Sequence, residues 1–408
     1  MMGPLVGLRV LDLSRVLAGP WASQIFCDYG ADVIKVERPG VGDDTRKFGP
    51  PWITDEGTGE IIDAAYFACA NRGKRSVTLN MSKPEGQAIV RRLAEQSDIV
   101  IENYKVGALA KYGLDYAALK EINPRLIYCS ITGFGQTGPY RNRPGYDFLI
   151  QGMGGLMSVT GERDDLPGGG PQRAGVALAD IIAGMYATSA ILAALHRRER
   201  TGQGEYIDLA LLDSQVAVLA NQGMNWLIGG NVPQRSGNGH PNIAPYQAFA
   251  TADGYIILAV GNDEQFVRFC NVAGRPDIGL DSKFTTIAAR NANRSELLPL
   301  VAALIRARPS EEWIEMLEAA GVPCGPINSI DKVFEDEQVQ ARAMRVDLPH
   351  PRAGTLPSIA NPVRFTNAPI EYTHAPPTLG QHTDEVLADL LGLDAAALAV
   401  LRAQGVIG

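Results

Sequence analysis

Five short apolar runs, separated by helical segments, constrain the fold more than any other feature of this sequence. The runs are RVLDL, DVIKVE, RSVTLN, DIVIENY and LIYCSIT. Strands that are buried on both faces have nearly continuous apolar runs of this kind. Helical segments such as KPEGQAIVRRLAEQS lie between them, and this alternation builds a parallel sheet with helices on both faces. The sequence therefore predicts an α/β fold with a doubly wound parallel sheet.

Three of the predicted helices begin with capping signals. Ser82 and Glu85 have the S-x-x-E spacing of a capping box, in which each side chain bonds the backbone of the other residue. Ser310 is expected to cap a helix over residues 311–320, and Thr383 or Asp384 is expected to cap the last helical segment.

Around Gly202 the character of the sequence changes. The stretch GGNVPQRSGNGHPNIAPY is typical of a linker or a binding loop because it is rich in Gly, Asn and Pro. We expect a β-hairpin that turns at Asp253-Gly254 to follow, and then three helices. This region is interpreted as a second, smaller domain.

Charge and cysteine usage exclude several classes of protein. With 37 Lys and Arg against 45 Asp and Glu, the net charge of -8 argues against a nucleic-acid partner. The five cysteines form no C-x-x-C pair, so neither a disulfide scaffold nor a zinc module is expected. The first residues contain no readable secretory signal, which makes the cytoplasm the expected location. The apolar run at 176–195 is interpreted as a buried core helix rather than a membrane span.

Two features near strand ends suggest a nucleotide-like ligand. Residues 133–138 match G-x-G-x-x-G, but Pro139 and Pro144 follow where a dinucleotide site needs a helix, so a nicotinamide site is not expected. That loop is interpreted either as a simple turn or as a loop that approaches phosphates. Glu37 and Arg38 end the second strand; an Arg there suits a phosphorylated ribose such as that of coenzyme A, and the alternative is a solvated strand end.

Asp180 is the only charged residue between Arg173 and His196. Its position favours the N-cap of the following helix, and the alternative is a poorly solvated carboxylate that acts as a nucleophile. A Ser-His-Asp hydrolase is not expected because the sequence contains no G-x-S-x-G segment. His240 lies in the polar loop, where it either faces a ligand or is exposed to solvent.

Seven segments in order resemble the family III CoA-transferases, and the resemblance runs along essentially the whole chain. The segments are LDLSRVLAGPWASQIFCDYGADVIKVERPGVGD, NRGKRSVTLN, ENYKVGALAKYGLDY, SITGFGQTGPYRNRPGYDF, GVALADIIAGMYATSAILAALHRRERTGQGEYIDLALLDS, GVPCGPINS and PTLGQHTDEVLADLLG. The resemblance implies that Asp180 is the catalytic nucleophile. It would carry first an acyl group as a mixed anhydride and then CoA as a thioester.

The resemblance also implies which residues bind the substrates. Contacts with CoA are expected from Val16, Ala18, Arg38, Leu79, Met81, Asn103, Tyr104, Lys111 and Tyr146. A glycine run found in the formyl-CoA transferase branch is absent from residues 236–246, which favours the branch that uses succinyl-CoA and glutarate-like acids. Ser236, Asn238, His240 and Asn242, with open backbone amides at Gly237 and Gly239, are expected to bind the distal carboxylate of a dicarboxylic acid, and His240 is the substrate-binding candidate.

The implied architecture is a large domain built from both chain ends, with a small domain between them. We expect residues 1–225 to form the N-terminal part of the large domain, 226–327 the linker and small domain, and 328–408 the return segment and C-terminal part. The resemblance further implies an interlinked homodimer that acts on acyl-CoA and a small acid and uses no metal.

Two alternatives to the transferase are open. An acyl-CoA racemase of the same superfamily would need a base where Tyr146 stands, and a Tyr with a pKa of about 10 is a poor base at neutral pH. A non-catalytic CoA-binding protein would need Asp180 to be only a helix cap.

Overall fold

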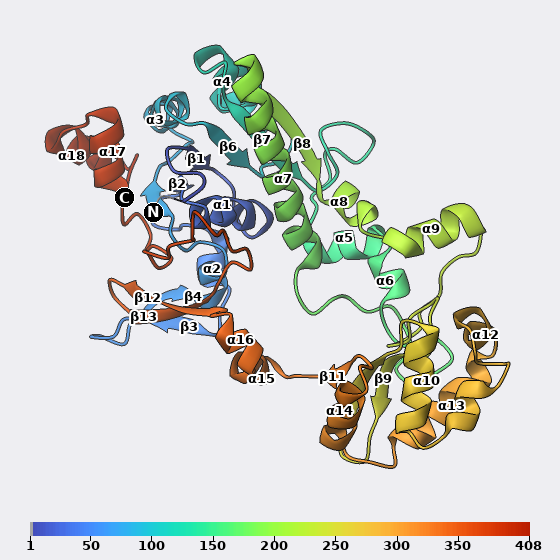
Figure 1. Cartoon of the computed structure of the whole chain (residues 1–408). Coiled ribbons are helices and arrows are strands. Elements are labelled where there is room, and N and C mark those ends of the chain that lie inside the picture. Colours follow the sequence, from blue (N-terminus) through green and yellow to red (C-terminus); the bar gives the residue numbers. More distant parts are fainter. Residues whose placement is uncertain (1–2) are drawn as a thin grey trace. The chain divides into compact units, whose positions relative to one another are not determined.

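The computed structural model describes residues 3–408, and these form two compact units. The first unit contains the chain up to Leu156, then Ala174–Met224 and Gln340–Gly408. The second unit contains Met157–Arg173 and Asn225–Val339. The first unit is therefore built from both ends of the chain (Figure 1). The domain boundaries expected from the sequence stay a prediction, because contacts alone do not show which segments fold independently.

A six-stranded sheet forms the centre of the first unit, and every neighbouring pair of strands is parallel. Its order is β5 (Arg75–Thr78), β2 (Asp32–Glu37), β1 (Arg9–Asp12), β6 (Ile99–Glu102), β7 (Ile127–Thr132) and β8 (Glu205–Ala210). The predicted α/β fold with a parallel sheet is thus confirmed.

Each face of this sheet is buried under helices. Val10 and Leu11 are neighbours on β1, yet they belong to different hydrophobic clusters because successive side chains on a strand point to opposite faces. One cluster includes residues of α3 (Pro84–Glu95), α4 (Tyr116–Ile122), α17 (Thr383–Leu391) and α18 (Ala395–Ala403). The other includes residues of α1 (Ala18–Asp28), α5 (Asp147–Met153) and α7 (Leu178–Thr201).

The strand order reverses between β1 and β6. From β1 the chain continues to β2 and then to β5 at one edge, whereas β6, β7 and β8 follow one another on the other side of β1. In open α/β sheets, ligands bind outside the carboxyl ends of the strands at such a reversal. The loops after Asp12 and Glu102 flank this point of the sheet.

Shorter elements complete the first unit and its connections to the second. They are η1 (Asp44–Lys47), β3 (Trp52–Thr54), β4 (Ile61–Ala64), α2 (Ala65–Ala68), η2 (Ala110–Tyr112), α6 (Leu156–Val159), α8 (Leu211–Ala217), α9 (Ala220–Gly229), α16 (Glu337–Ala341), β12 (Arg345–His350) and β13 (Gly354–Ile359). Strands β12 and β13 form an antiparallel hairpin where the sequence indicated only extended segments.

The second unit has its own antiparallel sheet and its own hydrophobic core. The expected hairpin turns at Asp253 and Gly254, between β9 (Tyr246–Ala250) and β10 (Tyr255–Ala259). The remaining elements are α10 (Asp263–Val272), α11 (Pro276–Leu280), α12 (Ile287–Ala292), α13 (Arg294–Ile305), α14 (Ser310–Ala319), β11 (Cys324–Pro326) and α15 (Ile330–Glu335).

The three predicted helix caps are wrong. Helix α3 begins one residue later than the capping box requires because Pro84 occupies its first turn, and the Ser82 hydroxyl donates to Asn80 Oδ1 at 2.6 Å instead. Pro309 rather than Ser310 occupies the N-cap of α14, and the Ser310 amide is held by Asp253 Oδ1 at 2.8 Å. His382 occupies the N-cap of α17.

Helix α7 is the one helix within residues 3–408 that is long and apolar enough to span a membrane by length and composition. Its small side chains, among them Ala183 and Ala187, are buried against α1 and the sheet. The expected role as a core helix agrees with this packing, and one such helix is weak evidence for a membrane span.

Candidate active site

Asp180 lies in the first turn of α7 and does not occupy its N-cap position. That position belongs to Ala177, which has no side-chain oxygen. Asp147 supplies the missing acceptor, because its Oδ1 accepts the backbone N–H of Ala179 at 2.9 Å and that of Asp180 at 3.4 Å. The cap interpretation of Asp180 is therefore wrong, and its carboxylate is left for another role.

Asp147 is itself held from two sides. Gln151, one turn later on α5, donates from Nε2 to Asp147 Oδ2 at 2.8 Å and accepts the Ala174 amide at 2.9 Å. Before Asp147, the backbone at Gly145 lies directly on Gly133, where a Cβ would come within 2.3 Å of the Gly133 Cα. Gly133 therefore serves backbone packing, and the following segment continues through turns to α5 without the helix that a dinucleotide needs.

The surroundings of Asp180 disfavour its negative charge. Burial and the neighbouring Asp147 carboxylate raise the pKa of Asp180 from 3.8 to about 7. Tyr66 on α2 interacts electrostatically with both carboxylates. Burial and the charges of Cys69, Asp180 and Asp147 raise the pKa of Tyr66. A carboxylate with weakened solvation is a better nucleophile than one in water.

Helix α7 packs closely against α1. A Cβ at Gly184 would lie 2.8 Å from the Ala18 carbonyl oxygen and 3.1 Å from Trp21 Cβ, so only glycine permits this approach. Asp180 stands one helical turn before Gly184. The contact therefore brings the end of α7 that carries Asp180 next to the loop that leads into α1.

The residues predicted to contact CoA all belong to the first unit, and most follow the carboxyl ends of strands. Val16 and Ala18 follow β1, Arg38 follows β2, Leu79 and Met81 follow β5, and Asn103 and Tyr104 follow β6. Lys111 lies in η2, and Tyr146 directly precedes α5. Their roles stay predictions, but their positions agree with a ligand at the reversal of the strand order.

These residues differ in what they offer a ligand. The side chains of Arg38, Lys111 and Tyr146 are exposed. The Leu79 side chain is 1% exposed and packs in the core, so only its backbone could reach a ligand. Asn103 Oδ1 accepts the Arg15 amide at 2.9 Å and Asn103 Nδ2 donates to the Arg15 carbonyl at 2.7 Å, which links the loops on both sides of the reversal.

A cavity of about 270 Å³ is lined by Glu102 and Lys105, which stand on either side of Asn103 and Tyr104 in the sequence. Tyr116, Tyr128 and Tyr206 also line it. Burial raises the pKa of Glu102 to about 7, although hydrogen bonds from Ser130 and the Tyr104 amide favour its charged form. The cavity thus contains a second carboxylate that is poorly solvated.

His240 belongs to the second unit, and its ring is held by its own loop. Its Nδ1 accepts the Asn242 amide at 3.1 Å, and its ring packs on Tyr246. In the neutral form, Nε2 is then the nitrogen that carries the proton and can donate to a ligand. A cavity of about 770 Å³ in this unit is lined by neighbouring loop residues, including Ser236 and Asn238.

The expectation of open amides in this loop is wrong. The Gly237 N–H donates to the Gly161 carbonyl at 3.2 Å, and the Gly239 N–H donates to the Ser236 carbonyl at 3.0 Å. Both amides are therefore used inside the unit, because the loop folds back on itself and on residues 157–173. These two amides are therefore not available to an acid, whereas the His240 side chain is a candidate donor.

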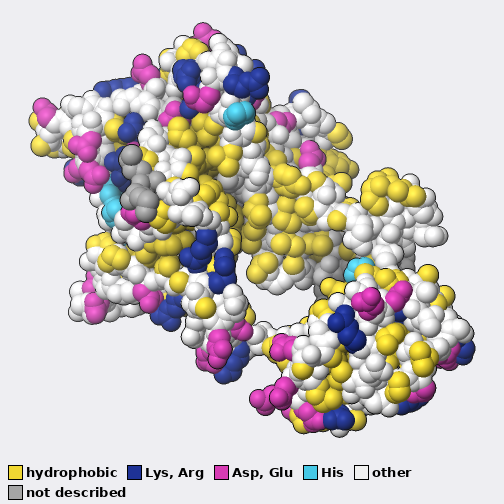
Figure 2. Space-filling view, viewed as in Figure 1, with side chains coloured by type: hydrophobic (Ala, Val, Ile, Leu, Met, Phe, Trp, Pro, Cys, Tyr) yellow, Lys and Arg dark blue, Asp and Glu magenta, His cyan; other side chains and the backbone are white. Residues whose placement is uncertain are grey.

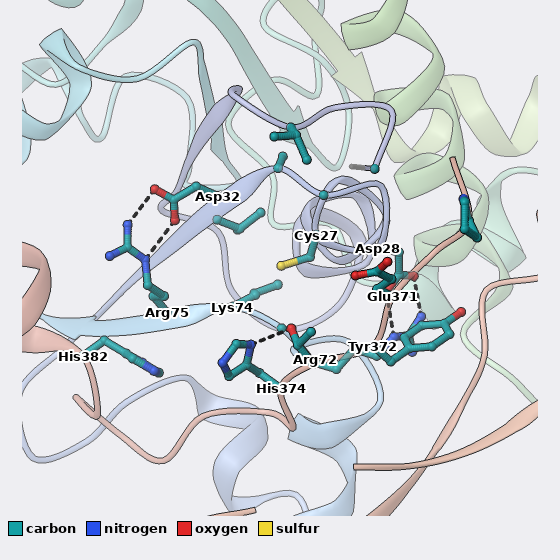
Figure 3. A pocket seen from close by; sticks show the side chains of 18 of the residues that line it. Cys27, Asp28, Asp32, Arg72, Lys74, Arg75, Glu371, Tyr372, His374 and His382 are labelled. Atoms are coloured by element: carbon teal, nitrogen blue, oxygen red, sulfur yellow. Dashed lines mark hydrogen bonds and ion pairs between the residues drawn. The ribbon is translucent and has the colours of Figure 1, made fainter. Parts of the chain in front are cut away.

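A further cavity of about 520 Å³ lies at the opposite edge of the sheet, where β2 and β5 begin. Its arginines are already paired: Arg72 with Asp28 at 2.5 Å and Arg75 with Asp32 at 2.6 Å (Figure 3). Because its position is the amino edge and its arginine charges are compensated, this cavity is not the candidate site.

Sequence reasoning missed Asp147, Gln151 and Tyr66. Asp147 stands in the segment GYD that carried the resemblance, but its partner helix begins about thirty residues later, so no local pattern indicates the contact. Within residues 3–408, no three His, Cys, Asp or Glu side chains are placed to hold a metal ion. A reaction without a metal stays a prediction.

The fold and the candidate site define the class of protein: an α/β protein whose parallel sheet has a reversal of strand order and whose helix α7 carries a poorly solvated carboxylate, Asp180. The chain belongs to CoA-transferase family III, whose sequence model matches residues 5–383. The prediction of a CoA-transferase is confirmed, and it is preferred over both the racemase and the non-catalytic protein.

Similar proteins match all or nearly all of the chain. The succinate–glutarate CoA-transferase of Agrobacterium fabrum is 51% identical over 394 residues, which are 97% of each chain. The succinyl-CoA:glutarate CoA-transferase of Mus musculus is 43% identical and covers all of this chain and 91% of its own. The crystal structure of a CaiB/BaiF family protein from Brucella suis is similar with a TM-score of 0.84 and 49% identity, over 96% of this chain and 100% of that one.

Proposed function

We propose that this enzyme transfers CoA from succinyl-CoA to glutarate or a dicarboxylate of similar length, with Asp180 as the nucleophile. The position of Asp180 carries the proposal: the carboxylate is poorly solvated, is not used as a helix cap, and lies on the helix that packs against the start of α1. The names of the bacterial and mouse relatives support the choice of succinyl-CoA and glutarate.

The proposed chemistry needs only carboxylates and thioesters. An oxygen of Asp180 attacks the thioester carbonyl, the C–S bond breaks, and CoA leaves as a thiolate. The thiolate then attacks the Asp180 carbonyl, the anhydride C–O bond breaks, and succinate leaves. Glutarate attacks the resulting aspartyl thioester, and the released thiolate attacks the glutaryl carbonyl to form glutaryl-CoA and restore Asp180. Water must be excluded because both intermediates hydrolyse.

CoA would bind at the carboxyl edge of the sheet. Val16, Ala18, Asn103 and Tyr104 flank the reversal of the strand order, and Arg38 is an exposed cation at the end of β2 that suits a phosphate. The remaining contacts would come from Leu79, Met81, Lys111 and Tyr146.

The acid would be selected by His240. Because Nδ1 accepts the Asn242 amide, Nε2 carries the proton of the neutral ring. Nε2 can therefore donate to the distal carboxylate of a dicarboxylic acid. A site built for that carboxylate disfavours a monocarboxylic acid because its donor would stay unpaired.

We also propose a homodimer with interlinked subunits in the cytoplasm. Hydrophobic side chains gather on the part of the first unit that holds α5, α7 and α8 (Figure 2). They include Phe148 at 60% exposure, Met185 at 55% and Val216 at 51%. Exposed apolar patches of this kind mark protein interfaces. Light scattering should give the mass of two chains, and an interlinked dimer should separate only when it unfolds.

A substrate screen tests the proposed function. The enzyme should be incubated with succinyl-CoA, acetyl-CoA or formyl-CoA and a series of acids, and new acyl-CoA products should be identified by mass. Glutarate or a neighbouring dicarboxylate should give a higher kcat/KM than hexanoate. His240→Ala should raise the KM for the acid more than that for succinyl-CoA, whereas His196→Ala, a change of an exposed histidine on α7, should alter neither. Preference for a monocarboxylic acid would contradict the role of His240.

A further inference from the structure

Val16 has a backbone conformation that its side chain disfavours. Its φ is +68°, and it is the only β-branched residue with a positive φ among residues 3–408, where the other non-glycine cases are Ala220 and Ala343. A β-branched residue in this region is strained by its Cβ, and such strain persists only where the surroundings enforce it. Strained residues of this kind gather at functional sites.

A buried ion pair enforces this conformation. The Val16 N–H donates to both carboxylate oxygens of Asp43, at 3.3 and 3.2 Å. Lys35 Nζ lies 2.9 Å from Asp43 Oδ2, and both side chains are completely buried. Lys35 Nζ also donates to the Ser14 carbonyl at 3.0 Å. The pair therefore holds the loop at Ser14 and at Val16.

The charge of Asp43 is secure in this position. Burial opposes its ionisation, but Lys35 and hydrogen bonds from Thr45 hold the pKa of Asp43 below its usual value. The Asp43 amide donates to Glu37 Oε2 at 2.9 Å, and Glu37 is paired with Arg46. A charged acceptor gives a stronger hydrogen bond to the Val16 amide than a neutral one.

The rest of the loop is fixed in the same way. Asp12 Oδ1 accepts the Ser14 amide at 2.9 Å. The Asn103 side chain accepts the Arg15 amide and donates to the Arg15 carbonyl. A Cβ at Gly19 would lie 2.3 Å from Ser14 Oγ, so the loop closes tightly on the start of α1. The amides of Ser14, Arg15 and Val16 are all bound to the protein, so the loop contributes a fixed shape rather than these donors.

We propose that Asp43 and Lys35 are positioning residues for acyl-CoA: they hold Val16 in the left-handed conformation and so fix the loop over residues 14–18 in the shape that receives CoA. Neither side chain reaches a ligand, since both are buried beneath the loop. The inference rests on the proposed CoA site, and it adds the reason why a strained valine stands at the reversal of the strand order.

A rescue experiment tests this role. Asp43→Asn removes the charge, Val16 should relax to a negative φ, and the dissociation constant for CoA and the KM for succinyl-CoA should both rise about tenfold with little change in kcat. Adding Val16→Gly should restore most of the affinity, because glycine adopts a positive φ without strain. Asp44→Asn is the matched control, since Asp44 reaches the loop only through an exposed ion pair with Arg15.

Asp43→Glu is used if Asp43→Asn does not fold. It keeps a charge for Lys35 but moves the carboxylate away from the Val16 amide, and the same rescue by Val16→Gly is expected. A lower melting temperature with unchanged CoA affinity, or no rescue by glycine, would overturn the inference. The wild-type protein is titrated with CoA first. If the wild type binds CoA and the variants bind it equally well, only this inference is refuted. If the wild type does not bind CoA, the proposed function is refuted as well.

Discussion

Asp147 Oδ1 accepts the backbone N–H of Asp180 at 3.4 Å, so one carboxylate orients the helix that carries the other. The same contact places a negative charge beside Asp180, which contributes to its raised pKa. Asp147 therefore affects both the position of the candidate nucleophile and, in addition to burial, its pKa. Such a neighbour is common where a carboxylate must react near neutral pH.

The rate should follow the ionisation of Asp180. Only the carboxylate attacks a thioester, and the pKa of Asp180 is raised to about 7. We therefore expect kcat/KM for succinyl-CoA to rise between about pH 6 and 8 and to level off above that range. The measurement is a pH–rate profile at saturating acid. A profile that is flat from pH 5 to 8 contradicts the raised pKa.

Asp147→Asn should move this profile. The amide oxygen still accepts the Ala179 and Asp180 amides, but the negative charge is gone, so the pKa of Asp180 should fall and the rising limb should shift down by about 0.5 to 1 pH unit. Asp389→Asn, an exposed change on α17, is the control and should leave the profile unchanged. If Asp147 has only a structural role, Asp147→Asn should lower kcat without shifting the rising limb of the pH–rate profile.

Asp180→Asn should stabilise the protein at neutral and higher pH. The pKa of this carboxyl is raised from 3.8 to about 7 by folding, so the folded state retains a proton that the unfolded state loses, and the wild type loses stability as pH rises from about 4 to 7. Removing the charge should recover about 1 to 3 kcal/mol at pH 8 after solvent screening. Urea denaturation at pH 8 and pH 5 should show a larger difference at pH 8.

Gly145→Ala should reduce activity by disturbing Asp147. A Cβ at Gly145 would lie 2.3 Å from Gly133 Cα, and backbone cannot move aside as a side chain can. We expect kcat to fall at least about tenfold. Gly325→Ala is a control with open space around its Cβ, and it should have normal activity. Normal activity in Gly145→Ala would show that this backbone contact does not position Asp147.

The sheet could be predicted from the sequence because each buried strand is a local apolar run, such as DVIKVE. The caps could not, because Pro84 and Pro309 shift the helix starts and the acceptor for α7 comes from Asp147 on another helix. The open amides expected at Gly237 and Gly239 failed for the same reason: their partners depend on how the loop folds. Local chemistry is readable in a sequence, whereas contacts between distant segments are not.

The most direct test is covalent modification of Asp180 during turnover. The enzyme is incubated with succinyl-CoA, the aspartyl thioester is trapped with hydroxylamine or borohydride, and the peptide that contains Asp180 is analysed by mass spectrometry. We expect the mass of an aspartyl hydroxamate or of the reduced side chain on Asp180, and no such change in Asp180→Asn, which should still bind CoA but lose activity. Modification of a different residue, or near-wild-type turnover by Asp180→Asn checked for deamidation, would contradict the account.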